Sequence, residues 1–204
     1  MSIRSKAISA GTALAVFAAT WFPALAQYGL RTTPIAVCYL SSMSAATKLS
    51  AGVCASFTGT GSGTNLTVTS VSGLIQPGMT LAGTGVAAGT TIVSQTSGTP
   101  GKAGVYVTSA ATTSSSASLT AGGIPVNWGP AGNVSATYAS ICAYAQGVVW
   151  RDDGGDPTAT AGSGGQALLA SSTVRDCMPY SGNFLLFEAI QLQSGAFLAV
   201  SYYR

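Results

Sequence analysis

Short stretches in which apolar and polar residues alternate recur along most of the chain. Residues 66–71 and 105–108 alternate with a period of two, and β-branched side chains dominate both stretches. Because successive side chains of a strand point to opposite faces, this period predicts β-strands. Further apolar runs predict strands at residues 35–40, 90–94, 137–144, 148–151, 184–190 and 196–203. Many short strands at this spacing predict an all-β fold, an antiparallel β-sandwich of jelly-roll or immunoglobulin-like type.

Glycine, proline and aspartate mark the turns between these runs. Residues 76–79, 87–90 and 152–157 combine the residue types that turns require, and residues 97–102 predict a hairpin loop. One short helix is predicted at residues 41–49, although its serines and threonine lower helix propensity. Apart from this helix, the chain is therefore expected to consist mostly of strands and turns.

The composition divides the chain into a scaffold and an inserted segment. Residues 55–123 are rich in Gly, Ser and Thr and contain no cysteine, while every acidic residue lies after residue 151. We expect residues 27–54 and 124–204 to form one β-sandwich scaffold that carries residues 55–123 as a β-rich insertion. The alternative for the insertion is a flexible Gly/Ser linker, but its paired β-branched runs favour strands.

Residues 1–26 have the three parts of a secretory signal peptide. Two basic residues precede an uncharged apolar run at residues 7–22, and the small-residue pattern of residues 24–26 follows Pro23. This order predicts cleavage after Ala26 and export to the periplasm, the exterior or the cell surface. The alternative is a retained anchor, since about 20 apolar residues span a bilayer. Pro23 beside a good cleavage site favours removal, after which no membrane segment is expected.

The mature chain carries very little charge. Charged residues are 6% of the sequence, where about 25% is usual. Removal of the signal peptide would leave six basic and five acidic residues, a net charge near +1. A nucleic-acid partner is not expected, because such proteins carry a basic footprint. Low charge together with 47% hydrophobic residues predicts a chain that associates with other protein surfaces.

Four cysteines follow the signal peptide: Cys38, Cys54, Cys142 and Cys177. An even number in an exported chain favours disulfides over metal ligation, particularly without a C-x-x-C spacing or any histidine. Three pairings are possible from sequence alone. The preferred pairs are Cys38 with Cys54 and Cys142 with Cys177, because each is local and lies on one side of the insertion. The alternative is four buried free thiols.

No catalytic, cofactor-binding or metal-binding residue is assigned. The absence of histidine excludes Ser-His-Asp and Cys-His catalysis and histidine metal ligands. Asp152, Asp153 and Asp156 are interpreted as a solvated turn capped by its aspartates, with a weak calcium site as the alternative. Residues 59–63 have the glycines of a phosphate loop but no following lysine, and they precede a strand rather than a helix.

Aromatic residues near the C-terminus are candidates for either core or surface. They are Tyr138, Tyr144, Trp150, Tyr202 and Tyr203. Sandwich core and cross-strand pairing is the preferred interpretation, and a sugar-stacking surface is the alternative. We expect Trp150 to be buried with its indole N–H reaching a partner at the sheet edge, and Arg151 to form an ion pair with the adjacent acidic turn.

Two stretches resemble modules of phage and prophage virion structural proteins. The likeness to a small β-sandwich module rests on residues 136–139, 149–160 and 198–204. The likeness to a Gly/Thr-rich element of tail-fibre proteins rests on residues 66–71, 75–79, 83–92 and 104–108. Together they cover about two thirds of residues 27–204. The resemblance implies a surface-display element within a β-sandwich scaffold. The signal peptide and cysteines depart from a virion protein and indicate a phage module adapted to export.

We therefore expect a non-catalytic structural or interaction protein, resembling a phage virion surface, decoration or fibre-associated protein. Its expected partners are other protein subunits, in a homo-oligomer or in a virion or envelope assembly. The alternative is an exported adhesin or carbohydrate-binding β-sandwich module with surface carbohydrate as its partner. An enzyme such as a glycoside hydrolase is disfavoured, because the acidic residues are few and clustered. No cofactor is expected.

Overall fold

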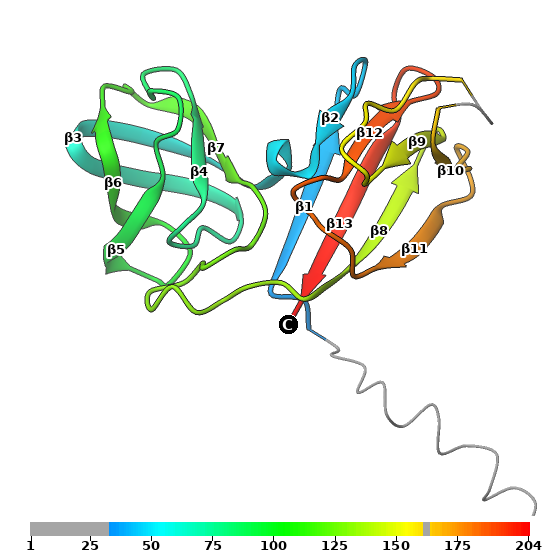
Figure 1. The fold of residues 1–204 in the computed structure, drawn as a ribbon. Coiled ribbons are helices and arrows are strands. Elements are labelled where there is room, and N and C mark those ends of the chain that lie inside the picture. Colours follow the sequence, from blue (N-terminus) through cyan, green and yellow to red (C-terminus); the bar gives the residue numbers. More distant parts are fainter. Residues whose placement is uncertain (1–32, 161–163) are drawn as a thin grey trace, which may run out of the picture. The chain divides into compact units, whose positions relative to one another are not determined.

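Antiparallel strands build nearly all of the structure (Figure 1). The structure is a computed structural model that describes residues 33–160 and 164–204. The strands are β1 (Ala36–Ser41), β2 (Thr47–Lys48), β3 (Val53–Gly73), β4 (Thr80–Gly83), β5 (Ile92–Gly98), β6 (Gly104–Thr112), β7 (Ala117–Gly122), β8 (Tyr138–Tyr144), β9 (Val148–Arg151), β10 (Gln166–Leu168), β11 (Asp176–Tyr180), β12 (Glu188–Gln191) and β13 (Phe197–Tyr203). One 3₁₀ turn, η1 (Leu49–Ala51), is present, and the described residues form no α-helix. The predicted all-β fold is confirmed.

Two sheets pack face to face as a β-sandwich. The first contains the neighbouring strands β11-β8-β13-β1, and the second has the order β10-β9-β12-β2. Every pairing in both sheets is antiparallel, with no shift of register between β13 and its neighbours β8 and β1. The strand β13 therefore lies inside the sheet, although it is the last strand of the chain.

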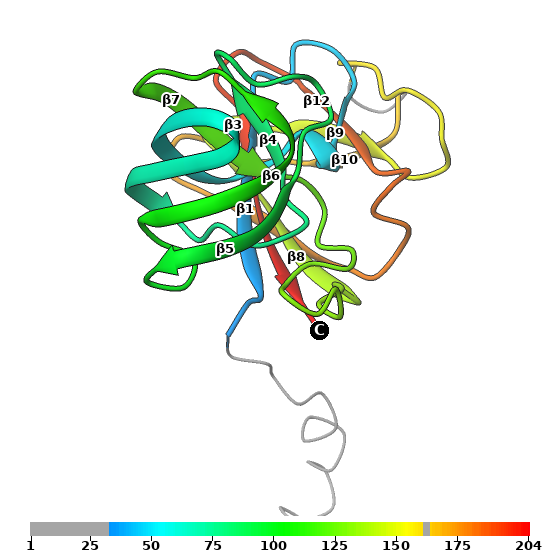
Figure 2. The same ribbon diagram turned by 90° about the vertical axis from the view of Figure 1, so that its left-hand side faces the viewer.

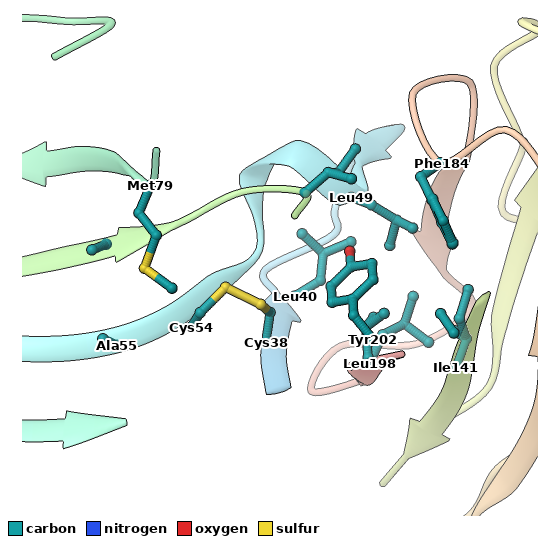
Figure 3. Close-up of a cluster of buried hydrophobic side chains, with 14 of the residues drawn as sticks. Cys38, Leu40, Leu49, Cys54, Ala55, Met79, Ile141, Phe184, Leu198 and Tyr202 are labelled. Carbon is teal, nitrogen blue, oxygen red and sulfur yellow. A yellow bond between two sulfur atoms is a disulfide. The ribbon is translucent and has the colours of Figure 1, made fainter. Parts of the chain in front are cut away.

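The sandwich core follows from strict alternation along β8 and β13. Ile141, Leu198 and Tyr202 point inward and are fully or almost fully buried, while their neighbours along the strand point outward. Figure 3 shows these side chains packed against Phe184 and Leu49. The phenyl ring of Phe184 meets the Tyr202 ring edge-on, with 5.6 Å between centroids. Apolar burial of this kind is the main source of stability.

Residues 53–122 form a small closed barrel (Figure 2). Along the chain, this segment lies between the sandwich strands β2 and β8. One half of the long strand β3 pairs with β7 and the other half with β6. The strands β5 and β4 then complete the ring, through their pairings with β6 and β7 and a bridge between Thr80 and Thr91. Its interior is filled by buried apolar side chains, including Phe57, Leu66 and Tyr106. Closure removes exposed sheet edges, which otherwise invite aggregation.

The first and last residues of the barrel segment lie side by side. The N–H of Gly123 donates a hydrogen bond of 3.0 Å to the carbonyl oxygen of Gly52, and Val53 is paired with Gly122. A disulfide between Cys38 and Cys54 ties the first strand of the sandwich to the first strand of the barrel. Both ends of the barrel segment are therefore held together by backbone pairing beside a covalent bond.

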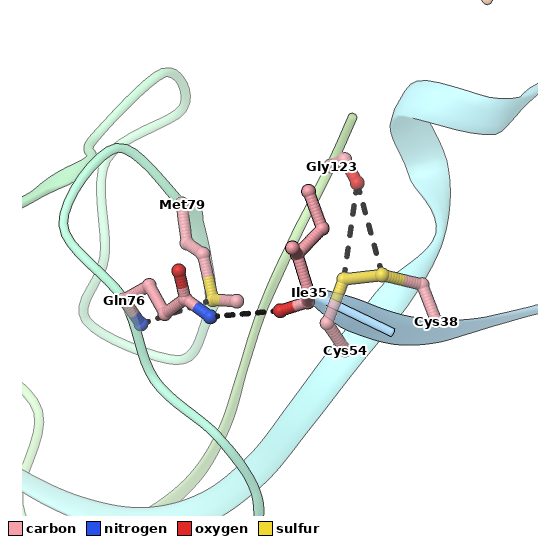
Figure 4. The surroundings of a disulfide bond; sticks show 6 residues. All are labelled: Ile35, Cys38, Cys54, Gln76, Met79 and Gly123. Carbon is pink, nitrogen blue, oxygen red and sulfur yellow. Dashed lines mark hydrogen bonds between the residues drawn. A yellow bond between two sulfur atoms is a disulfide. The ribbon is translucent and has the colours of Figure 1, made fainter. Parts of the chain in front are cut away.

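Figure 4 shows the surroundings of this disulfide. Its two sulfur atoms lie 3.9 and 3.8 Å from the carbonyl oxygen of Gly123. Neither sulfur carries a hydrogen, so these are close contacts rather than hydrogen bonds. The amide of Gln76 also donates a 3.0 Å hydrogen bond to the carbonyl oxygen of Ile35. The junction is thus fixed by packing as well as by the covalent link.

Most predicted strands and both preferred disulfides are confirmed. Strands are present within or overlapping the predicted ranges 35–40, 66–71, 90–94, 105–108, 137–144, 148–151 and 196–203. The hairpin loop at residues 97–102 joins β5 to β6. Cys142 is bonded to Cys177, as expected alongside the Cys38–Cys54 pair. The predicted signal peptide, residues 1–26, lies outside the described residues.

Two local predictions are wrong. Residues 41–49 do not form a helix; they are mainly extended chain, with the short strand β2 and the start of η1. The run at residues 184–190 is a strand only from Glu188. Its first half is a turn, because the Asn183 side-chain oxygen accepts the N–H of Leu185 at 3.0 Å and its carbonyl accepts that of Leu186 at 3.1 Å. Asparagine competes with strand pairing in this way.

Candidate functional site

The candidate site is the outward face of the strands β11, β8, β13 and β1. The outward side chains are those that alternate with the core residues: Val37, Tyr39 and Ser41 on β1; Phe197, Ala199, Ser201 and Tyr203 on β13; Tyr138, Ser140, Cys142 and Tyr144 on β8; and Cys177 and Pro179 on β11. We call this set the outer face. None of these side chains is fully buried, so the outer face is open to other molecules in the described structure.

The outer face carries no charged side chain on any of its four described strands. Solvent-facing sheet surfaces are ordinarily polar, because the opposite face supplies the core. Here aromatic, aliphatic and hydroxyl side chains occupy the outward positions, together with the disulfide-bonded Cys142 and Cys177. Tyrosine and phenylalanine are enriched in protein interfaces, and charged residues are depleted there. The outer face therefore resembles protein interfaces in its aromatic side chains and its lack of charge.

Two aromatic pairs lie on the outer face, each formed by residues directly opposite on β8 and β13. Tyr138 and Tyr203 have ring centroids 5.2 Å apart at an angle of 34°. Tyr144 and Phe197 are stacked, with centroids 5.1 Å apart and planes within 6°. Such cross-strand pairs stabilise the sheet and fix the ring positions. Because each ring packs against its partner, the pairs form two aromatic ridges across β8 and β13.

Tyr39 is the most prominent aromatic side chain of the outer face. It lies on β1, opposite Ala199 of β13, and is 53% exposed. A hollow of about 230 Å³ lies beside it, lined by Tyr39 and Val37 of β1 and by residues of β3 that include Val53 and Ser56. A projecting ring and a hollow thus occur side by side at the β1 edge of the outer face.

The Cys142–Cys177 disulfide crosses between β8 and β11 on the outer face. The two cysteines are directly opposite each other in the register, with Cys177 exposed and Cys142 half-buried. The other disulfide differs, because Cys38 and Cys54 are only 1% and 8% exposed. A reducing agent in solution therefore has better access to Cys142–Cys177 than to Cys38–Cys54.

The acidic turn is held together by contacts within the protein. Arg151 binds both carboxylate oxygens of Asp153, at 2.9 Å from Nε and 2.5 Å from Nη2, and the N–H of Gly155 donates to the same carboxylate at 3.1 Å. These contacts, led by the hydrogen bond from Arg151, hold the pKa of Asp153 below its ordinary range. Within residues 33–160 and 164–204, no cluster of acidic residues and cysteines has metal-binding geometry. The expected ion pair and capped turn are confirmed.

Asp152 is also engaged within the protein. It accepts a hydrogen bond of 3.2 Å from the hydroxyl of Tyr180 on β11. Burial, and then the negative charge of Asp152, raise the pKa of Tyr180 above its ordinary value. The contact joins the turn after β9 to the first sheet. Asp152 thus has a structural partner in the described part of the chain.

The five predicted aromatic residues divide between core and outer face. Trp150 and Tyr202 are buried, whereas Tyr138, Tyr144 and Tyr203 lie on the outer face. Trp150 stacks on Phe187 with centroids 5.1 Å apart. Its expected position at a sheet edge is wrong, because β9 lies between β10 and β12. Sequence reasoning missed Tyr39 and Phe197, which the period-two pattern of β1 and β13 places outward with the other three.

A larger hollow lies away from the outer face. It has a volume of about 550 Å³ and is lined by Leu74, Pro77 and Pro130 together with polar residues of β5. Its lining includes no charged side chain.

No helix among the described residues has the length and apolarity that a membrane crossing requires.

Comparisons with models of protein families, with curated proteins and with solved structures give no match for this chain. The likeness to phage modules therefore stays a prediction.

Proposed function

We propose that this protein is a non-catalytic structural or interaction protein that joins a larger assembly through its outer face. The uncharged, aromatic outer face is the observation that carries the proposal. Scattered apolar residues are normal on surfaces, but a contiguous apolar patch marks an interaction site. The resemblance to phage virion proteins suggests a virion or envelope assembly.

Export is the second part of the proposal. Two disulfides are compatible with an oxidising compartment, since such bonds seldom persist in the cytosol. The predicted signal peptide would deliver the chain to that compartment. A phage-derived module on a cell envelope or an exported particle would then meet its partner outside the cytoplasm.

Fractionation of the producing cells and of any released particles tests the proposal. The wild-type chain should sediment with a high-mass fraction, and Tyr39→Lys, which places a charge on the outer face, should release it into the soluble fraction. Val93→Lys is the matched control, because Val93 lies on β5, away from the outer face, and is 51% exposed. Equal sedimentation of all three proteins would overturn the role of the outer face.

Carbohydrate binding is the second candidate function. The exposed ring of Tyr39, with serines elsewhere on the outer face, favours it, because sugars stack on aromatic rings and accept hydrogen bonds from hydroxyls. The ring pairs count against it, since Tyr144 and Phe197 stack on each other. Calorimetry with neutral oligosaccharides decides: heat of binding that Tyr39→Ala abolishes would favour this candidate over the first.

A further inference from the structure

We propose that the outer face binds a second copy of this chain, so that two sandwiches pack through their first sheets. The inference rests on the proposed function and names the partner. Charge is the first argument. A two-fold interface brings the same patch of each copy together, so a charge near the axis would face its own like charge. An outer face without any charged side chain on its described strands meets this requirement throughout.

Shape is the second argument. In a two-fold contact every projection must meet a depression on the same surface. The outer face supplies both at its β1 edge, where the exposed Tyr39 ring stands beside the hollow of about 230 Å³. The aromatic ridges of Tyr138 with Tyr203 and Tyr144 with Phe197 flank the small side chains of Ala199 and Ser201. Ridges beside small residues allow two such faces to interdigitate.

Area sets the expected strength. Four strands about 4.8 Å apart and about seven residues long make a flat area of roughly 400 Å² for each copy. Two copies together then cover about 800 Å², below the roughly 1,200 Å² at which standard stable interfaces begin. We therefore expect the pair to be weak and reversible. Aligned packing of twisted sheets, at about −30°, brings the strands of both copies into contact along their length.

The test is sedimentation velocity of the purified mature chain over a concentration series. Wild type should shift from monomer toward dimer as its concentration rises from about 1 to about 200 µM, a range in which a weak pair becomes populated. Tyr39→Lys should weaken the dimer at least about tenfold, because each copy would bring a like charge to the interface. Ser41→Lys should have the same direction of effect, and it provides a second variant at an exposed position of β1.

Matched controls separate the outer face from surface charge in general. Val93→Lys on β5 and Ser118→Lys on β7 add the same charge at exposed barrel positions and should leave the dimer unchanged. A thermal melt by circular dichroism shows that each variant is folded. A wild-type chain that stays monomeric at about 200 µM, or a dimer that survives both outer-face variants, would overturn the second copy as partner. The fractionation test of Tyr39→Lys is independent of this result, because it asks whether the outer face holds the chain in a larger assembly and not which partner it binds.

Discussion

Single residues of the sandwich core show which side chains the fold depends on. Trp150 is 7% exposed, and its ring contacts the rings of Phe187 and of Tyr180 on β11. Its burial could be expected from its position in an apolar run, but its partners could not. Phe187 lies outside the strands, and the turn that positions it depends on Asn183, a polar residue that immediately precedes the apolar run.

Truncation of Trp150 tests the size of this contribution. Trp150→Ala should lower the free energy of unfolding by about 3–5 kcal/mol, because it removes an aromatic side chain from a packed core. Urea denaturation followed by circular dichroism measures the change. Asp153→Asn is the comparison, with little effect expected, since Asp153 is exposed. A Trp150→Ala protein as stable as wild type would contradict the proposed role of the indole.

Tyr202 differs from Trp150 in that its buried side chain includes a hydroxyl without a hydrogen-bond partner among the described residues. No hydrogen bond to its Oη exists among the described residues, although the side chain is fully buried beside Leu40 and Leu49 (Figure 3). An unpaired buried polar group costs about 1–3 kcal/mol. Tyr202→Phe should therefore leave the free energy of unfolding unchanged or raise it by about 1 kcal/mol. A loss of stability on this substitution would show that the hydroxyl has a partner.

The pH dependence of the same variant gives an independent check. Burial raises the pKa of Tyr202 above its ordinary value of 10.0. The unfolded chain therefore ionises first as the pH rises, and the free energy of unfolding falls above about pH 10. Tyr202→Phe removes one such group, so its stability should fall less steeply than that of wild type. Parallel curves for the two proteins would contradict a raised pKa at this site.

At the scale of elements, alternation predicted the strands that have one buried and one exposed face. The strands β8 and β13 follow the period-two rule throughout, and the sequence places both correctly. The strands β4, β7, β10 and β11 were missed; β4 and β10 are short, and β11 includes a proline. Pairing across long sequence separations, such as β1 with β13, leaves no local signal. It comes from tertiary packing, which single-sequence patterns do not contain.

The two disulfides should differ in reactivity, because their exposure differs. Mild reduction of the folded protein should open Cys142–Cys177 first, since Cys177 is exposed on the outer face and the other bridge is buried. Loop lengths of 35 and 16 residues correspond to stabilisation of about 4 and about 3 kcal/mol in the chain-entropy account. Alkylation followed by peptide mass mapping reports the order. Earlier labelling of Cys38 and Cys54 would contradict it.

The whole molecule is where sequence reasoning was least complete. The composition marked residues 55–123 as a separate segment, but nothing local indicated that the strands β3 to β7 close into a barrel. Closure depends on the two halves of β3 pairing with different strands. The outer face was likewise only partly predicted. Its aromatic residues stood out in the sequence, whereas its lack of charge became visible only once four distant strands were placed side by side.

The barrel segment should be separable from the sandwich. We expect deletion of residues 55–123, bridged by a short Gly-Ser linker, to leave a cooperative thermal transition. The hydrogen bond between Gly52 and Gly123 shows that the two chain ends to be joined lie close together. Keeping Cys54 retains its disulfide. The deletion exposes Trp128, which packs beside Gly78, so it is made together with Trp128→Ser. A broad, non-cooperative melt would mean that the barrel is part of the scaffold core.

The central claim is that the outer face is covered when the protein performs its function. Hydroxyl-radical footprinting of the native assembly, compared with the dilute purified chain, measures this at single residues. The account predicts that Tyr39 and Tyr138, which are 53% and 39% exposed in the free chain, become protected in the assembly. Leu185, 61% exposed and outside the outer face, should be oxidised equally in both samples. Equal oxidation of Tyr39 in the free and assembled protein would contradict the account.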